Sequence, residues 1–327
     1  MAKKAPFAFP SLAYLKKVFP TFPLLRGDPS LKVLHKKNFE DNFTLKKFSD
    51  IFTRYRQTPF TMPSPNKAVI LLCSGGIDSV VLWEILLRKY KLKVFPLRHT
   101  TPKKQEEKAF QFFLEYFRKK YPKQCQDVFT FGHEFLFSFQ KETYHLFEKD
   151  QKMRIPNLSI HDGKQTVAFT IPITRLGVYA LKAYEYALYL RSYANVDVQT
   201  AFVAITPEDS AYYREATLTV LRSFNLSICT LLGDYRFQFT SPYLEKSFPF
   251  KTKLDIISFA KKTGLPLEMT WSCTDDLPSQ CGECFSCLLR KRIFDISGIK
   301  DKTTYGRKGF WISQAGKKFI GRIQSSK

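Results

Sequence analysis

The chain has 327 residues, enough for one large domain, or one domain with appendages, around a substantial core. Apolar residues make up 44% of it, which excludes a disordered protein, and no run reaches the ~18–20 uncharged apolar residues of a membrane-spanning helix. The formal net charge is +23, which fits either an acidic partner or RNA, or simply solvated basic flanks.

The ends of the chain hold most of this charge, +8 in residues 1–66 and +9 in residues 288–327. Residues 1–66 are rich in Lys, Phe and Pro, and the phenylalanines indicate a basic extension that packs onto another surface instead of remaining free. The apolar stretch after Lys4 is broken by prolines, so we expect no targeting peptide and a cytoplasmic protein.

From residue 67 onward, apolar runs alternate with amphipathic stretches. This alternation predicts a doubly wound α/β domain, in which parallel strands are joined by helical crossovers. The expected strands are 68–73, 92–97, 127–131 and 198–205, and the expected helices are 77–90, 106–120, 176–192, 209–222 and 252–263. Residues 132–168 fit neither pattern and predict an irregular or hairpin insertion within a domain that spans residues 67–270.

A phosphate-binding loop is predicted directly after the first strand. Two consecutive glycines allow a sharp turn and a close approach of the backbone to a ligand. The amides of the turn and of the following helix N-terminus favour an anion, while the serines add hydroxyl donors. Asp78 can hold Mg²⁺ against the phosphates or orient the turn. The predicted loop residues are Ser74, Gly75, Gly76, Ile77, Asp78 and Ser79.

The loop lacks the Gly-Lys-Ser/Thr ending of a Walker A loop and the Gly-x-Gly-x-x-Gly of a dinucleotide-binding fold. It resembles instead the S-G-G-x-D-S loop of the PP-loop ATP-pyrophosphatases. That resemblance implies ATP as the cosubstrate and transfer of AMP to a substrate oxygen. An ordinary strand-turn-helix with capping serines is the plain alternative.

Four of the seven cysteines cluster near the C-terminus, at Cys273, Cys281, Cys284 and Cys287. Four thiolates within fifteen residues suit a closed, structural Zn²⁺ site, while an iron–sulfur cluster is the main alternative. We therefore expect a zinc knuckle over residues 271–295, followed by a basic tail over residues 296–327. The other cysteines are expected to be buried small side chains.

The two motifs together resemble the QueC family of 7-cyano-7-deazaguanine synthases, over residues 67–295. The sequence around the cysteines carries the likeness: Thr270-Trp271-Ser272-Cys273 and Cys281-Gly282-Glu283-Cys284-Phe285-Ser286-Cys287-Leu288-Leu289-Arg290. The resemblance implies that ATP adenylates the carboxylate of 7-carboxy-7-deazaguanine. Ammonia then displaces AMP to give the amide, and a second ATP drives dehydration to the nitrile. The resemblance is also compatible with a homodimer.

The resemblance also implies roles for individual residues. Asp78, Lys253 and Arg175 take the positions of catalytic groups, Lys253 because it follows Thr240-Ser241-Pro242 as a family lysine follows its Thr-Pro segment. The implied substrate residues are Arg98, His99, Asp209, Tyr212 and Arg214. The plain alternatives are surface charges for the arginines and Lys253, a solvated loop pair for Arg98 and His99, and a core position for Tyr212.

Departures from the family pattern fall on the acceptor side of the site. Family Pro-Gly-Arg-Asn has become Pro172-Ile173-Thr174-Arg175-Leu176, and the loop around Asp209 is shortened. Diverged relatives occur in anti-phage systems of the CBASS and Qat types, where one activity joins the deazaguanine carboxylate to a protein amine. The nitrogen nucleophile therefore stays open between ammonia and a protein acceptor. A PP-loop enzyme that modifies tRNA and an RNA-binding module with an inactive loop are the alternatives from other classes.

Overall fold

A computed structural model describes residues 40–100, 103–132, 160–161, 164–165, 175–210, 214–274, 276–282 and 284–306. Most of the predicted N-terminal extension, most of the predicted insertion and the end of the basic tail lie outside these ranges. Within the described part of the chain, no helix has the length and hydropathy that a bilayer crossing requires.

The centre of the molecule is a five-stranded sheet in which every neighbouring pair of strands is parallel. Its order is β3-β2-β1-β6-β7. The strands are β1 Ala68–Leu72, β2 Lys93–His99, β3 Phe129–Phe131, β6 Val198–Phe202 and β7 Gln238–Thr240. The chain winds from β1 outward to β3, then returns to β6 on the other side of β1. This reversal confirms the predicted doubly wound fold and makes the carboxyl end of β1 its topological switch point.

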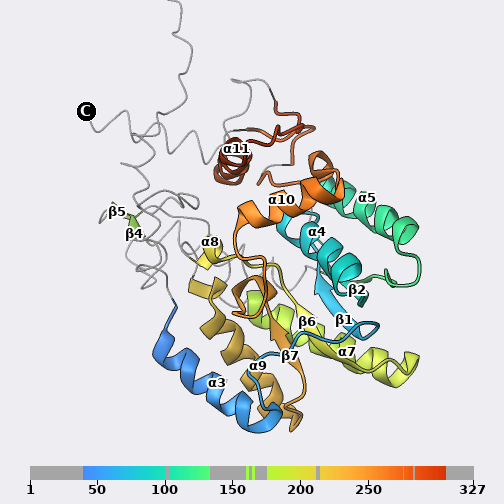
Figure 1. Cartoon of the computed structure of the whole chain (residues 1–327), viewed down its shortest axis with the longest axis vertical. Helices are drawn as coiled ribbons and strands as arrows, with labels where there is room; N and C mark the ends of the chain where they lie inside the picture. Colours follow the sequence, from blue (N-terminus) through green and yellow to red (C-terminus); the bar gives the residue numbers. More distant parts are fainter. Residues whose placement is uncertain are drawn as a thin grey trace, which may run out of the picture.

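Helices cover both faces of this sheet (Figure 1). One face carries α4 Ile77–Glu84, which runs on into a π-helix Ile85–Lys89, together with α5 Lys104–Lys120, α10 Lys253–Thr263 and α11 Phe285–Ser297. The opposite face carries α3 Asn42–Arg56, α7 Arg175–Ala194 and α9 Leu218–Leu232. Short 3-10 turns lie at Arg214–Ala216, Pro242–Leu244 and Leu267–Met269.

The strand β1 shows why the sheet is buried on both faces. All five of its residues are buried, with Val69 and Leu71 in the core under α4 and Ile70 in the core under α7. Successive side chains of a strand point to opposite faces, so a continuous apolar run is what a central parallel strand requires. The antiparallel pair β4 Ile160–His161 and β5 Lys164–Gln165 is the described part of the predicted insertion.

The predicted helix over residues 209–222 is wrong. A short helix, α8 Pro207–Ser210, comes first, and the long helix α9 begins only at Leu218. The carboxylate of Asp209 accepts hydrogen bonds from the amide and hydroxyl of Thr206, which closes a tight local turn. The hydroxyl of Thr217 accepts from the amide of Val220 and sets the start of α9.

A helix within the predicted N-terminal extension was missed. The carboxylate of Asp41 caps α3, and the carboxylate of Glu40 accepts hydrogen bonds from the first amides of α9, at Leu218 and Thr219. At the far end of α3, the ring of Tyr55 stacks on that of Tyr235 at a centroid distance of 3.7 Å. The last part of the extension thus packs along α9, as the phenylalanine content indicated.

Candidate active site

The predicted phosphate loop joins β1 to α4 at the switch point of the sheet. Gly75 has a φ of +82°, and a Cβ placed on it would lie 2.9 Å from the amide nitrogen of Phe110 and 3.1 Å from the carbonyl oxygen of Glu106. Both atoms belong to the backbone of α5, so only glycine allows the loop to turn this close to that helix.

Two serine hydroxyls shape the loop from within. The Ser79 hydroxyl donates to the carbonyl of Gly76 at 3.1 Å and lies 3.3 Å from the Ser74 hydroxyl. The Ser74 hydroxyl in turn accepts from the Gly76 amide at 3.3 Å. The N-cap of α4 is Gly76, which supplies no side-chain cap, so no capping side chain occupies the first amides of α4 at the positive end of the helix dipole. This arrangement suits a phosphate group.

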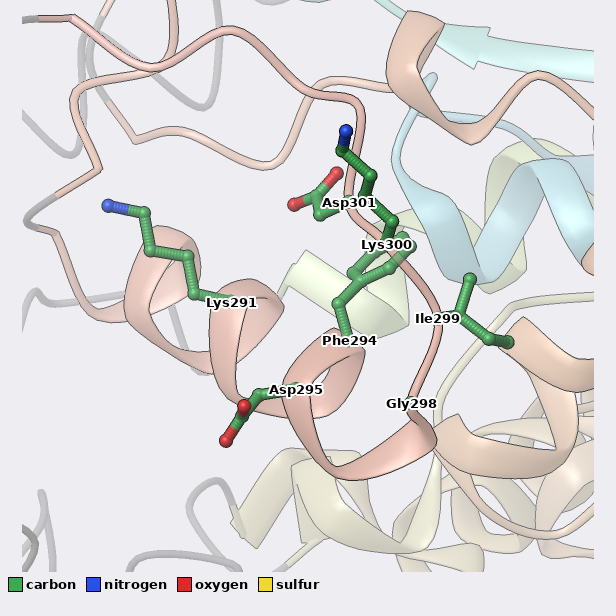
Figure 2. Close-up of a pocket in the computed structure, with 7 residues that line it drawn as sticks. All are labelled: Lys291, Phe294, Asp295, Gly298, Ile299, Lys300 and Asp301. Atoms are coloured by element: carbon green, nitrogen blue, oxygen red, sulfur yellow. The ribbon is translucent and has the colours of Figure 1, made fainter.

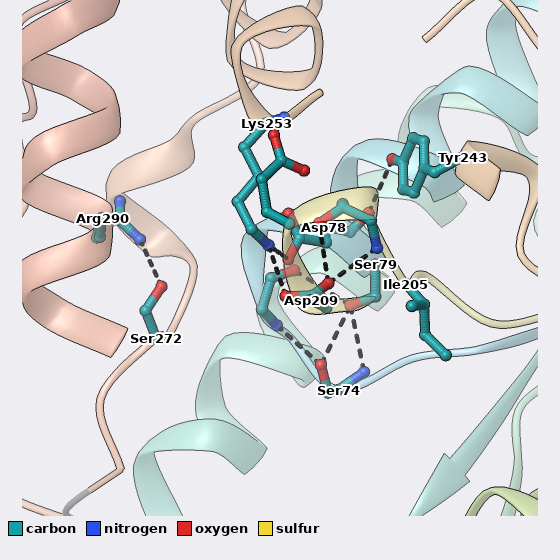
Figure 3. A network of polar contacts seen from close by, with 12 residues as sticks. Ser74, Asp78, Ser79, Ile205, Asp209, Tyr243, Lys253, Ser272 and Arg290 are labelled. Carbon is teal, nitrogen blue, oxygen red and sulfur yellow. Dashed lines mark hydrogen bonds and ion pairs between the residues drawn. The ribbon is translucent and has the colours of Figure 1, made fainter. Parts of the chain in front are cut away.

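Lys253 brings a buried cation to the loop (Figure 3). Its ammonium lies 2.7 Å from Asp78 Oδ2 and 3.2 Å from Asp209 Oδ1. The backbone fixes its position, because Lys253 is the first residue of α10 and Thr252 and Asp255 form a capping box around that start. The predicted residues Asp78, Asp209 and Lys253 are therefore in direct contact.

Glu208 is a fourth member of this group that sequence reasoning missed. Its buried carboxylate accepts a hydrogen bond from the amide of Lys253 at 3.0 Å, whereas its Oε2 has no hydrogen-bond partner within the described residues. Two carboxylates thus contact the ammonium of Lys253, and a third binds its backbone amide. An acidic residue directly before Asp209 was the available signal, but nothing in the sequence placed it against α10.

Burial and charge together set the protonation of this group. Burial raises the pKa of Asp78 above its ordinary value, against the opposing effect of the Lys253 ammonium. Burial likewise raises the pKa of Glu208. Burial would lower the pKa of Lys253, but the carboxylates of Asp209, Asp78 and Glu208 outweigh it and raise that pKa. Lys253 therefore remains a full positive charge beside the loop.

Tyr243 supports the first turn of α4 from below. It is fully buried, and its hydroxyl donates to the backbone carbonyl of Asp78 at 3.0 Å. Burial, and then the charge of Asp78, raises the pKa of this phenol, so it stays a neutral donor. It follows the Thr240-Ser241-Pro242 stretch in sequence, but nothing in the sequence placed its hydroxyl against α4.

Arg98 and His99 occupy the carboxyl end of β2, but they face different surroundings. Arg98 is 1% exposed and binds the carboxylate of Glu107 and the carbonyl of Cys73, with its Nη2 left without a hydrogen-bond partner among the described residues. His99 is half-buried beside Tyr179, whose hydroxyl lies 3.3 Å from its Nδ1. Arg98 thus lies under the loop and His99 at its flank.

The side chains of three other predicted residues are not described by the structure. Tyr212 lies outside the described residues. The backbones of Arg175 and Arg214 are described, at the starts of α7 and of a 3-10 turn, but their side chains are not. Their roles stay predictions.

The four clustered cysteines converge on one point. Their Sγ atoms all lie within 4.8 Å of one another, and two pairs are 3.9 Å apart. A tetrahedral ion with metal–sulfur bonds of about 2.3 Å places its ligands about 3.8 Å apart. The amides of Cys281 and Cys284 also donate to neighbouring sulfurs. Cys273, Cys281, Cys284 and Cys287 thus fit a single metal ion, whereas an iron–sulfur cluster spreads its cysteines around several metals.

Comparison with protein families decides the affiliation. The family model described as "Queuosine biosynthesis protein QueC" matches residues 67–298, well over half of the chain. The chain belongs to the QueC family. A 7-cyano-7-deazaguanine synthase from Campylobacter jejuni (strain 81116) is 26% identical over 246 residues, which cover 73% of this chain and 99% of that protein. The synthase of Allorhizobium ampelinum is 24% identical over 250 residues, with 75% and 95% coverage.

Solved structures give a weaker likeness. The U34-tRNA thiolase NcsA from Methanococcus maripaludis has 12% sequence identity and a TM-score of 0.34, with 77% of this chain and 71% of that chain covered.

The residues matched by the QueC family model include the phosphate loop, Lys253 and all four clustered cysteines, while α3 lies before them.

A surface hollow of about 450 Å³ lies beside α11 and the segment that follows this helix (Figure 2). Its lining residues are Lys291, Phe294, Asp295, Gly298, Ile299, Lys300 and Asp301. None of them is among the residues predicted to bind the nucleotide or the substrate.

Proposed function

We propose that this QueC family member is an ATP-dependent ligase that adenylates the carboxylate of 7-carboxy-7-deazaguanine for attack by a nitrogen nucleophile. The observation that carries the proposal is the contact between Lys253 and Asp78, which brings a permanent cation to a phosphate loop at the switch point of the sheet. The names of the curated relatives support the choice of substrate.

The chain's own groups suit the phosphates of ATP and their magnesium ion. The loop from Ser74 to Ser79 offers amides and hydroxyls to the pyrophosphate. Asp78 and Asp209 offer carboxylate oxygens, the ligands that Mg²⁺ prefers, and Lys253 offers charge where negative charge grows during transfer. Bound Mg²⁺ would supply further neutralisation of the phosphates.

Activation by ATP answers the chemical problem of this substrate. A carboxylate is a poor electrophile, because its negative charge repels a nucleophile and oxide is a poor leaving group. Joining its oxygen to AMP supplies a good leaving group, so that an amine can form a C–N bond. Among the residues proposed to hold the acid, His99 ends β2 and Asp209 lies in the short helix α8 that follows β6, on the carboxyl side of strands, where α/β sheets bind ligands.

The cysteine cluster is proposed to hold structural Zn²⁺. Four thiolates complete a tetrahedral shell and leave no open position for a reacting molecule. The metal would join the 270–282 segment to α11 instead of taking part in the chemistry.

Product analysis tests the proposal. The protein is incubated with ATP, Mg²⁺, 7-carboxy-7-deazaguanine and ammonia, and the products are identified by mass spectrometry. AMP and pyrophosphate with nitrile support the family reaction with ammonia, and amide or an AMP adduct without nitrile supports another amine acceptor. Absence of any acid-dependent ATP consumption contradicts the proposal.

A further inference from the structure

The segment from Thr270 to Ser272 connects the cysteine cluster with the phosphate loop. The amide of Trp271 donates to the carbonyl of Gly75 at 3.0 Å. The carbonyl of Trp271 lies 3.6 Å from the point where a Cβ would stand on Gly76. This backbone segment therefore contacts both glycines of the loop.

Arg290 holds this segment in place (Figure 3). Arg290 is 2% exposed, and its guanidinium donates from Nη1 to the hydroxyls of Thr270 at 2.7 Å and Ser272 at 3.2 Å. Its Nη2 donates to the carbonyl of Leu267 at 2.7 Å. Arg290 lies on α11, one turn after Cys287. The hydrogen bonds to Thr270 and Ser272, on either side of Trp271, therefore come from a helix that begins at the cysteine cluster.

Gln280 makes a second connection from the same side. Its side-chain oxygen accepts from the amide of Ser272 at 3.2 Å, and its side-chain nitrogen donates to the carbonyl of Thr270 at 3.0 Å. Gln280 directly precedes Cys281. Both bonds fix the backbone on either side of Trp271, whose amide binds the carbonyl of Gly75.

The charge of Arg290 is neutralised away from the loop. Its Nε lies 3.2 Å from Asp301 Oδ2. Burial disfavours the ionised carboxylate, but the charge of Arg290 and hydrogen bonds from Tyr305 and Thr303 lower the pKa of Asp301 overall. An arginine whose donors are taken up by protein groups acts on a bound phosphate through the backbone it holds.

We propose that Arg290 is a positioning residue for the phosphate loop, acting through the Trp271–Gly75 hydrogen bond. Both α5 and this segment contact the loop at Gly75, so loosening the segment lets the loop amides depart from the geometry that a phosphate needs. The proposal rests on the proposed function only in that the loop binds pyrophosphate.

Direct binding measures this role without relying on turnover. Mg²⁺–pyrophosphate and Mg²⁺–ATP are titrated calorimetrically into the wild-type protein and into Arg290→Met, which keeps the bulk of the stem. The Kd is expected to rise about 10-fold, the effect of losing one or two hydrogen bonds that hold the loop. Bound metal, measured by elemental analysis, is expected to stay at the wild-type level. The matched control is Arg292→Met, because Arg292 lies on the same helix and pairs with Asp295.

A milder variant covers the case in which Arg290→Met does not fold. Thr270→Val with Ser272→Ala removes the hydroxyls that Arg290 binds and leaves the arginine paired with Asp301. A raised Kd with normal metal content supports the proposal. An unchanged Kd in the folded variants, or loss of metal in parallel with loss of binding, overturns it. Failure of the wild-type protein to bind pyrophosphate contradicts the proposed function instead.

Discussion

Lys253 and Asp78 are 175 positions apart in sequence, yet their side chains lie 2.7 Å apart and join the starts of α10 and α4. The two helix N-termini therefore meet at the phosphate loop with a fixed cation between them. Asp209 completes the contact from the turn after β6. This relationship makes the loop part of a charged site rather than an isolated turn.

Replacing Lys253 by methionine is expected to abolish pyrophosphate binding and to destabilise the fold. The substitution leaves the carboxylates of Asp78 and Asp209 without the cation that they contact, and breaking a buried pair of this kind costs roughly 3 kcal/mol. ATP–pyrophosphate exchange and urea unfolding measure the two effects. Lys262→Met is the matched control, since Lys262 lies exposed on the same helix. Retention of ATP–pyrophosphate exchange by Lys253→Met would mean that the ammonium of Lys253 takes no part in the reaction.

Glu208 predicts a particular dependence of stability on pH. In the folded state, burial raises the pKa of Glu208 above its ordinary value of 4.5. At a pH between the unfolded-state pKa and the folded-state pKa, the folded state therefore binds more protons than the unfolded state. Stability contributed by this group is therefore present below its unfolded pKa and is lost as pH rises through its folded pKa. Glu208→Gln keeps the acceptor for the Lys253 amide and removes the titration.

The comparison of the two proteins by urea unfolding between pH 4 and pH 8 isolates this effect. The free energy of unfolding of Glu208→Gln is expected to fall less steeply with rising pH than that of the wild-type protein. Exposed Glu115 lies far along α5, and Glu115→Gln serves as the control. Equal slopes for all three proteins would mean that Glu208 has an ordinary pKa.

Much of the fold could be read from the sequence because the decisive signals were local. The buried run that became β1 and the helix from Ile77 follow from residue pattern alone. The start of α9 did not, because Asp209 turns back to Thr206 and forms a separate element. Helix α3 has a capping aspartate but only one buried side chain, that of Phe52, and packing on α9 stabilises it.

The residues of the site also divide into those that a local motif predicts and those that depend on contacts across the fold. The loop residues and the cysteines were predictable, since each motif carries its chemistry within a short stretch. Glu208 and Tyr243 could not be assigned, because their roles depend on contacts with Lys253 and Asp78 across the fold. Arg98 illustrates the limit differently, since its sequence position fits a ligand contact while its side chain is turned inward onto Glu107.

Metal is expected in the purified protein at one zinc ion per chain. Because the ion binds the folded cluster, it should stabilise the fold by about 4 kcal/mol when free metal stands at 1,000 times its Kd. Cys287→Ser should lose the ion and lower the Tm, while Cys125→Ala, at a solitary buried cysteine, should retain it. Elemental analysis and thermal unfolding test this, and iron with visible absorption would identify a different cofactor.

Gly75 and Gly298 provide a matched pair for testing how closely the phosphate loop packs. Both have positive φ, +82° and +64°, so alanine at either position carries a backbone strain of about 1–2 kcal/mol. A Cβ at Gly298 meets open space, whereas one at Gly75 meets the backbone of α5 at 2.9 Å. Gly298→Ala is therefore expected to show the strain alone, with normal binding of Mg²⁺–pyrophosphate.

Gly75→Ala should show that strain together with a displaced loop, so that pyrophosphate binding is lost and the free energy of unfolding falls further than in Gly298→Ala. Calorimetric titration and urea unfolding of the two variants separate strain from contact, because only the contact differs between them. If both variants bound pyrophosphate equally well, the approach of α5 to Gly75 would have no bearing on the ligand. The loop would then owe its shape to Ser74 and Ser79, whose hydroxyls bind within the turn.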